Sequence, residues 1–96
     1  MGTKEAFKQK VEAEVELAQA KLAEFRAQAK SSAADARVKY AEHIEELEQK
    51  LEATKVKLHE LSEAGEDKWE RLKDGVESAW TAMSTAVRDA VAKLKH

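Results

Sequence analysis

The chain of 96 residues contains no cysteine and no proline, only three glycines and only five aromatic side chains. Without cysteine it has no disulfides and no thiolate metal sites. The N-terminal segment MGTKEAFKQKVEAEVEL has no uninterrupted apolar run, which argues against a signal peptide and against a membrane span. We therefore expect a cytoplasmic protein.

The chain also lacks a large excess of either positive or negative charge. The 17 basic and 19 acidic residues leave a net charge of −2 and are mixed along the chain. Nucleic-acid binding would need clustered Lys and Arg, so we expect no nucleic-acid partner. A composition rich in Ala, Glu, Lys and Leu is typical of long helices or a coiled coil. A small and highly charged chain has a thin core, which favours association with a second copy.

Apolar and small residues recur at alternating steps of three and four, as in the seam of a coiled coil. The seam residues that we expect to form the core or an interface are Phe7, Val11, Val15, Leu22, Phe25, Tyr40, Ile44, Leu47, Leu51, Leu58, Leu61, Trp69, Leu72, Val76, Trp80, Met83, Val87 and Leu94. The residues before Ala29 and those after Tyr40 do not share one heptad register. Steps of four bridge the two sets, which locally relaxes a supercoil.

The stretch EAGED, residues 63–67, combines a helix stop with a helix start. Gly65 suits the left-handed conformation that follows many helix C-termini. Glu66 and Asp67 suit the positive end of the next helix. The sequence therefore predicts a single domain over residues 1–96, with a first helix over about 3–62, a bend over 63–66 and a second helix over about 67–95.

A break at Ser31 and Ser32 is the alternative, and it would divide the chain into three similar helices. Two serines without glycine or proline are a weak helix breaker, and alanine, which surrounds them, has the highest helix propensity. The favoured prediction is an all-α fold in which one long helix packs against a shorter antiparallel helix as a helical hairpin or coiled coil. The alternative fold is a three-helix bundle.

The predicted first helix is about 90 Å long and the second is about half of that. The second helix would leave the apolar stripe from Phe7 to Ala29 uncovered, and such a stripe marks a partner surface. A twofold symmetric homodimer with antiparallel long helices is the simplest way to cover it. A further protein partner is compatible with the same stripe.

No arrangement of residues predicts catalysis or metal binding. The serines lack a histidine and an acid at helical spacing, and there is no glycine-rich phosphate cradle. Di-metal bundles need Glu-x-x-His, whereas a tyrosine and a valine precede His43 and His59 by three residues. His59 and Glu63 alone are too few ligands for a metal site. We therefore expect no catalytic, cofactor or metal site, and no enzyme activity.

Trp69 and Trp80 are eleven residues apart and share one helix face. The favoured interpretation is that both pack inside the bundle. The alternative is that VESAWTAMSTAVRDAVAKLKH forms an amphipathic helix that binds a membrane surface through its apolar face. Glu77 and Asp89 dilute its positive charge. Gly75, inside the same helix, costs about 1 kcal/mol relative to alanine, and it serves either a close approach near a tryptophan or a mild kink.

Three stretches together resemble a family of small bacterial coiled-coil proteins that are labelled as stress-response proteins. They are TKEAFKQKVEAEVE, ADARVKYAEHIEELEQKLEATKVKLHEL and AGEDKWERLKDGVESAW. The last is the most specific, because it combines an acidic pair, two tryptophans and an internal glycine. The resemblance implies a soluble bacterial helical protein without an assigned enzyme activity. We therefore expect a non-enzymatic structural or interaction protein of the stress response that acts through protein–protein contacts.

Overall fold

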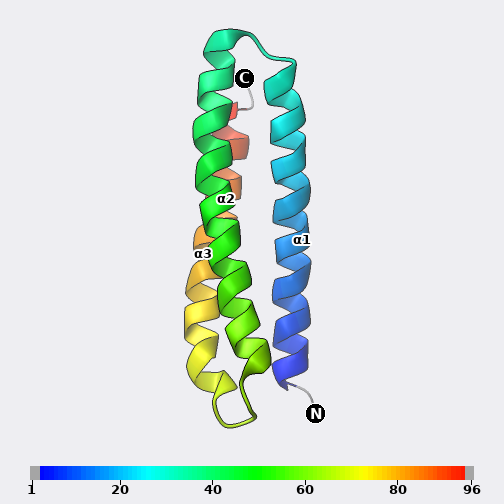
Figure 1. The fold of residues 1–96 in the computed structure, drawn as a ribbon, viewed down its shortest axis with the longest axis vertical. Helices are drawn as coiled ribbons and strands as arrows, with labels where there is room; N and C mark the ends of the chain where they lie inside the picture. The colour runs from blue at the N-terminus through cyan, green and yellow to red at the C-terminus, as the bar shows by residue number, and fades with distance from the viewer. Residues whose placement is uncertain (1–2, 95–96) are drawn as a thin grey trace.

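The computed structural model describes residues 3–94, and these form three α-helices that run up, down and up (Figure 1). Helix α1 spans Thr3–Lys30, α2 spans Ala34–Glu63 and α3 spans Trp69–Leu94. The bundle measures 51 × 19 × 17 Å. The all-α class is therefore confirmed. For the described residues, the three-helix arrangement fits better than the hairpin that the sequence analysis favoured.

The prediction of one continuous helix over residues 3–62 is wrong, because the chain turns at Ser31–Ala33. The hydroxyls of Ser31 and Ser32 both donate to the backbone oxygen of Gln28, at 3.2 and 2.7 Å. Serine hydroxyls compete in this way with continued helical bonding. Ala33 then adopts an extended conformation, with φ −64° and ψ 160°, before α2 begins.

Arg37, in the first turn of α2, stabilises the same turn between α1 and α2 through its side chain. Its Nε donates to the backbone oxygen of Ser32 at 3.1 Å, and its Nη2 donates to that of Lys30 at 3.2 Å. Carbonyls at a helix C-terminus lack intrahelical partners, and a cation near them is favourable. The guanidinium therefore supplies the donors that a continuous helix would have provided.

Folding back at this turn lets one chain bury its own apolar stripe. Val11, Val15, Leu22 and Phe25 of α1 are at most 7% exposed. Full burial of a Val, Leu or Phe side chain contributes about 1.5–3 kcal/mol, whereas two serines interrupt a helix at little cost. The predicted reason for a dimer, an uncovered stripe from Phe7 to Ala29, is therefore absent from the described bundle.

The second turn lies at residues 64–68, slightly later than the predicted bend. α2 is capped by Ala64, with φ −78° and ψ 146°, and the amide of Ala64 donates to the backbone oxygen of Leu61. Gly65 does not have a positive φ, so the predicted left-handed cap at this glycine is wrong. The predicted end of the last helix at Lys95 lies outside the described residues.

The core runs along the seam of all these helices. Of the predicted seam residues, those buried are Val11, Val15, Leu22, Phe25, Leu47, Leu51, Leu58, Leu61, Trp69, Val76 and Met83. Those half-buried and packed against them are Phe7, Tyr40, Ile44, Leu72, Trp80, Val87 and Leu94. Ala18, Ala86 and Ala90 are buried as well, and buried Thr54 donates its hydroxyl to the backbone oxygen of Lys50 at 2.9 Å.

Gly75 serves no close approach to either tryptophan. A Cβ added to it would meet only the Cδ of Lys57 within 4 Å, at 4.0 Å. That is an ordinary van der Waals contact with a flexible side chain. The glycine therefore leaves room for alanine in α3.

Candidate interaction surface

We call the end with the α2–α3 turn the lower end and the end with the α1–α2 turn the upper end, as they stand in Figure 1. Three aromatic rings meet at the lower end. The centroid of the Phe7 ring lies 6.4 Å from that of Trp69 and 6.4 Å from that of Trp80, in tilted and edge-to-face arrangements. Such pairs contribute about 0.5–1.5 kcal/mol beyond their buried area. The tryptophans thus join α3 to α1.

Lysines lie over two of these three rings. The ammonium group of Lys10 lies 5.2 Å from the Trp80 ring centroid, and that of Lys73 lies 5.5 Å from the Phe7 centroid. Both distances fall within the range of cation–π attraction. Two half-buried rings of the cluster, Phe7 and Trp80, are therefore each in contact with a cation.

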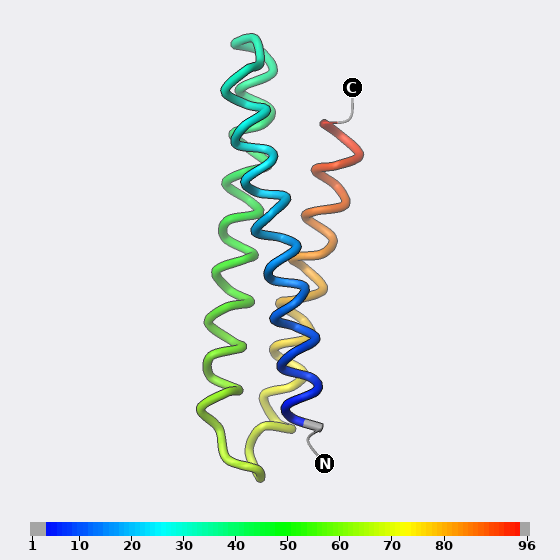
Figure 2. Tube along the Cα trace, turned by 90° about the vertical axis from the view of Figure 1, so that its right-hand side faces the viewer, coloured from blue at the N-terminus to red at the C-terminus, as the bar shows by residue number. Residues whose placement is uncertain are grey.

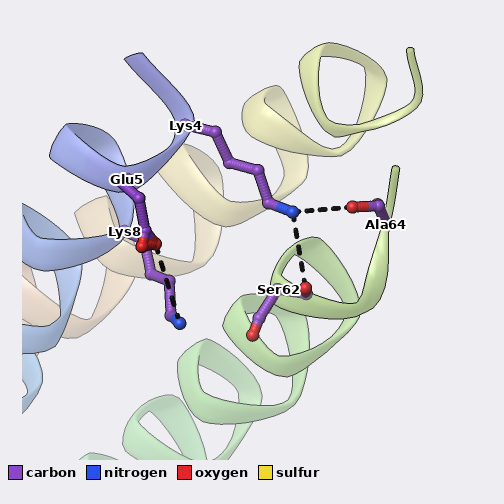
Figure 3. A network of polar contacts seen from close by, with 5 residues as sticks. All are labelled: Lys4, Glu5, Lys8, Ser62 and Ala64. Atoms are coloured by element: carbon purple, nitrogen blue, oxygen red, sulfur yellow. Dashed lines mark hydrogen bonds and ion pairs between the residues drawn. The ribbon is translucent and has the colours of Figure 1, made fainter. Parts of the chain in front are cut away.

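Lys4 ties the start of α1 to the end of α2 (Figure 3). Its Nζ donates to the backbone oxygen of Ala64 at 2.7 Å and to that of Ser62 at 3.4 Å. The last carbonyls of a helix lack intrahelical donors and carry the negative end of its dipole. Lys4 therefore satisfies the C-terminus of α2 from a neighbouring helix.

The histidines do not gather metal ligands. No cluster of three or more His, Asp or Glu side chains suited to a metal occurs within residues 3–94. His59 is exposed, and His43 is half-buried on α2. The Nδ1 atom of His43 is buried and has no hydrogen-bond partner within the described part of the chain. His43 borders a shallow groove with Lys39, Glu46 and Lys93.

One open and largely apolar surface lies between α1 and α3, the two helices that contact each other least. A groove of about 350 Å³ runs between them. It is lined by Glu14, Leu17, Ala18, Ala20, Lys21, Glu24, Met83, Ser84, Val87 and Arg88. We call it the α1–α3 groove. Leu17, which lines it, is 63% exposed.

Sequence reasoning missed Leu17 because the residue stands directly beside the seam. The seam step from Val15 leads to Ala18, which is 2% exposed, and this leaves the larger leucine outside. The available signal was a leucine at a position that the seam does not use. Among the residues that the structure describes, two other large apolar side chains are exposed, Val38 at 62% and Val56 at 47%, and both belong to α2.

The upper end is built from fewer contacts. α3 stops at Leu94, below the α1–α2 turn, so the tip of the bundle is a two-helix hairpin (Figure 2). Tyr40 donates its hydroxyl to the Oε1 of Gln28 at 3.3 Å across this hairpin. Further down, Arg26 of α1 forms an ion pair with Glu48 of α2. These polar contacts join α1 to α2, and the last turns of α3 reach the same level, because Val91 and Leu94 line a pocket with Gln28 and Tyr40.

Comparisons with protein-family models, with characterised proteins and with solved structures find no match to this chain. Within residues 3–94, no helix contains an apolar stretch long enough to cross a membrane.

Proposed function

We propose that this chain is a non-enzymatic interaction protein that acts through protein–protein contacts on the outside of its helical bundle. Its setting, the cytoplasm of a bacterium under stress, rests on the resemblance of its three sequence stretches to the stress-response coiled-coil family. The observation that carries the proposal is the α1–α3 groove with Leu17 exposed at its side.

The composition of the groove supports protein binding over a chance exposure. Single exposed apolar residues are common on soluble proteins. Leu17, however, shares one groove with exposed Ala20 and half-buried Val87, and buried Ala18 and Met83 lie at the base of the groove. A contiguous apolar surface rimmed by charged residues is typical of a contact with another protein. Such a surface also fits the apolar face of a helix, which binds through residues at helical spacing.

Site-specific photo-crosslinking in the producing cell tests this function. A photoreactive side chain replaces Leu17 in one variant and the equally exposed Val38 in the control. We expect discrete protein adducts from position 17 and none from position 38. The same adducts from both positions, or none from either, would show that the groove has no special role.

Membrane binding through α3 is the rival function. The most amphipathic helix of the bundle is α3, and its apolar face is turned inward, with Val76, Met83 and Ala90 at most 1% exposed. Membrane insertion would therefore require α3 to leave the core, which favours protein binding over the membrane alternative. Flotation with anionic vesicles distinguishes the two. We expect no flotation and no blue shift of tryptophan fluorescence, and the membrane alternative predicts both.

A further inference from the structure

We propose that the partner in the α1–α3 groove is a second copy of this chain, docked antiparallel so that the twofold axis passes beside Leu17. This inference rests on the proposed function and names its partner. It differs from the dimer predicted from sequence, because here each chain keeps its own folded bundle. The exposed surface of α1, not its buried seam, makes the contact.

The exposed face of α1 has an apolar centre and charged ends. At 100° per residue, Lys10, Glu14, Lys21 and Glu24 all lie within about 60° of Leu17 around the helix axis. Ala13 and Ala20 lie within the same sector. Of these six neighbours, only Glu14 and Lys21 are partly shielded from solvent, and the others are exposed. Small side chains around a single leucine permit close approach of a second helix.

The signs of these charges are self-complementary about Leu17. An antiparallel twofold contact opposes residues that lie equally far before and after its axis. It therefore places Lys10 of one copy opposite Glu24 of the other, each seven residues from Leu17. Glu14, three residues before Leu17, lies beside Lys21 of the other copy, four residues after it, with an offset of about 1.5 Å along the helix. Each of these pairs occurs twice in the dimer. A parallel in-register contact would instead oppose each charge to its own copy, so charge selects the antiparallel orientation.

Existing contacts leave these charges available. Lys21 Nζ lies 3.6 Å from Glu24 Oε2 in the same helix, with 42% and 51% of the two side chains exposed. An exposed pair of this kind contributes little and exchanges partners readily. Lys10 lies over Trp80 at 5.2 Å, and its residue is exposed to solvent. Docking therefore breaks no buried interaction of the bundle.

Helix α3 completes the docking surface. Met83, Ser84 and Val87 form its side of the α1–α3 groove, and Arg88 adds a basic group there. The middle of the groove is thus uncharged, whereas Glu14, Lys21, Glu24 and Arg88 surround it. An apolar centre with a polar rim is the usual anatomy of a protein interface.

Sedimentation equilibrium across a range of concentrations tests the dimer. We expect the wild-type chain to associate reversibly to twice its mass. Leu17→Lys brings two ammonium groups together at the axis and should raise the dissociation constant at least tenfold. Val38→Lys is the matched control, because Val38 is 62% exposed against 63% for Leu17, and it should change the constant less than twofold. Circular dichroism checks that both variants keep their helices.

Charge reversal tests the orientation. Glu14→Lys alone and Lys21→Glu alone should each weaken dimerisation by about tenfold, because each turns two attractive pairs into repulsive ones. The double variant restores opposite charges across the axis and should recover the wild-type constant to within about threefold. A double variant as weak as either single variant would overturn the antiparallel arrangement.

The outcomes separate this inference from the proposed function. A wild-type chain that stays monomeric at every concentration overturns self-docking. The crosslink at position 17 then decides the function: adducts whose mass is not twice that of the chain retain a protein-binding role, and a lack of any adduct removes it. A Leu17→Lys variant that dimerises like the wild type also overturns self-docking.

Discussion

At the lower end of the bundle α1 and α3 meet around aromatic rings, whereas the tip of the upper end consists of α1 and α2 alone and is closed by polar contacts. Phe7, Trp69 and Trp80 form the lower cluster. Tyr40 and Gln28 share one hydrogen bond of 3.3 Å at the upper end. Burial of large apolar side chains stabilises more than exposed hydrogen bonds do. The lower end should therefore be the more stable half of the molecule.

The two turns differ in a second way. The lower turn contains Gly65 but does not use a positive φ. The upper turn contains no glycine or proline, and instead its serine hydroxyls and Arg37 bind the last carbonyls of α1. Side-chain hydrogen bonds can therefore end a helix where no conventional breaker is present.

The largest expected effect comes from removing an aromatic anchor. Trp69 is 7% exposed, so Trp69→Ala should lower the free energy of unfolding by about 3–5 kcal/mol. Tyr40→Ala, at the other end, should cost only about 1–2 kcal/mol, because Tyr40 is half-buried. Urea unfolding followed by circular dichroism measures both. Equal losses would mean that the two ends are equally well packed.

A smaller effect is expected from the cations that bind helix carbonyls. Lys4→Met keeps an apolar stem but removes two donors from partly buried carbonyls, and should cost about 1–2 kcal/mol. Arg37→Met removes two donors from exposed carbonyls and should cost about 0.5–1 kcal/mol. Thermal unfolding of the two variants side by side compares the turns. A larger loss for Arg37→Met would reverse the ranking of the ends.

The glycines separate helix propensity from turn geometry. Gly75→Ala should stabilise the protein by about 1 kcal/mol, because it lies inside α3 and has room for a Cβ. Gly65→Ala is the comparison. Gly65 has no atom within 4 Å of an added Cβ and no positive φ, so the change should stay within about 0.5 kcal/mol. Urea unfolding measures both variants. A marked loss of unfolding free energy in Gly65→Ala would indicate that Gly65 adopts the left-handed conformation after all.

Proline at the start of α2 gives the smallest expected effect and the clearest sign. Ala34 is the first residue of α2, where proline is favoured, and Ala33 before it has the extended conformation that proline requires. Ala34→Pro should therefore stabilise the bundle by about 0.4–1 kcal/mol. In a continuous helix the same change would cost about 3 kcal/mol. The direction of the shift in melting temperature separates the two folds.

The core was predictable from sequence because heptad spacing reports which helix face is apolar, whether or not the helix is interrupted. The break at Ser31–Ala33 was not, because its causes act over a distance. Arg37 reaches back to the carbonyls of Ser32 and Lys30, and α1 gains burial only after the chain has turned. The mismatch of heptad registers between Ala29 and Tyr40 was the available signal, and it fits a turn as well as a relaxed supercoil.

The groove was less predictable than the core. Leu17 and Ala18 are adjacent, and apolar spacing alone places Ala18 in the seam without indicating what happens to its larger neighbour. The packing of α1 against α3 leaves Leu17 63% exposed. The exposure of Leu17 depends on how α1, α2 and α3 pack together, so a local sequence pattern cannot predict it.

One distance within a single chain tests the three-helix arrangement of residues 3–94 most directly. Gln9 and His59 are both exposed, and the chain has no cysteine, so spin labels can be placed at Gln9→Cys and His59→Cys alone. Labelled protein is diluted with excess unlabelled protein, which removes distances between chains. We expect the labels within about 30 Å, because α1 and α2 lie side by side with axes about 8–10 Å apart. A distance near 75 Å, the length of 50 helical residues, would contradict the turn at Ser31–Ala33.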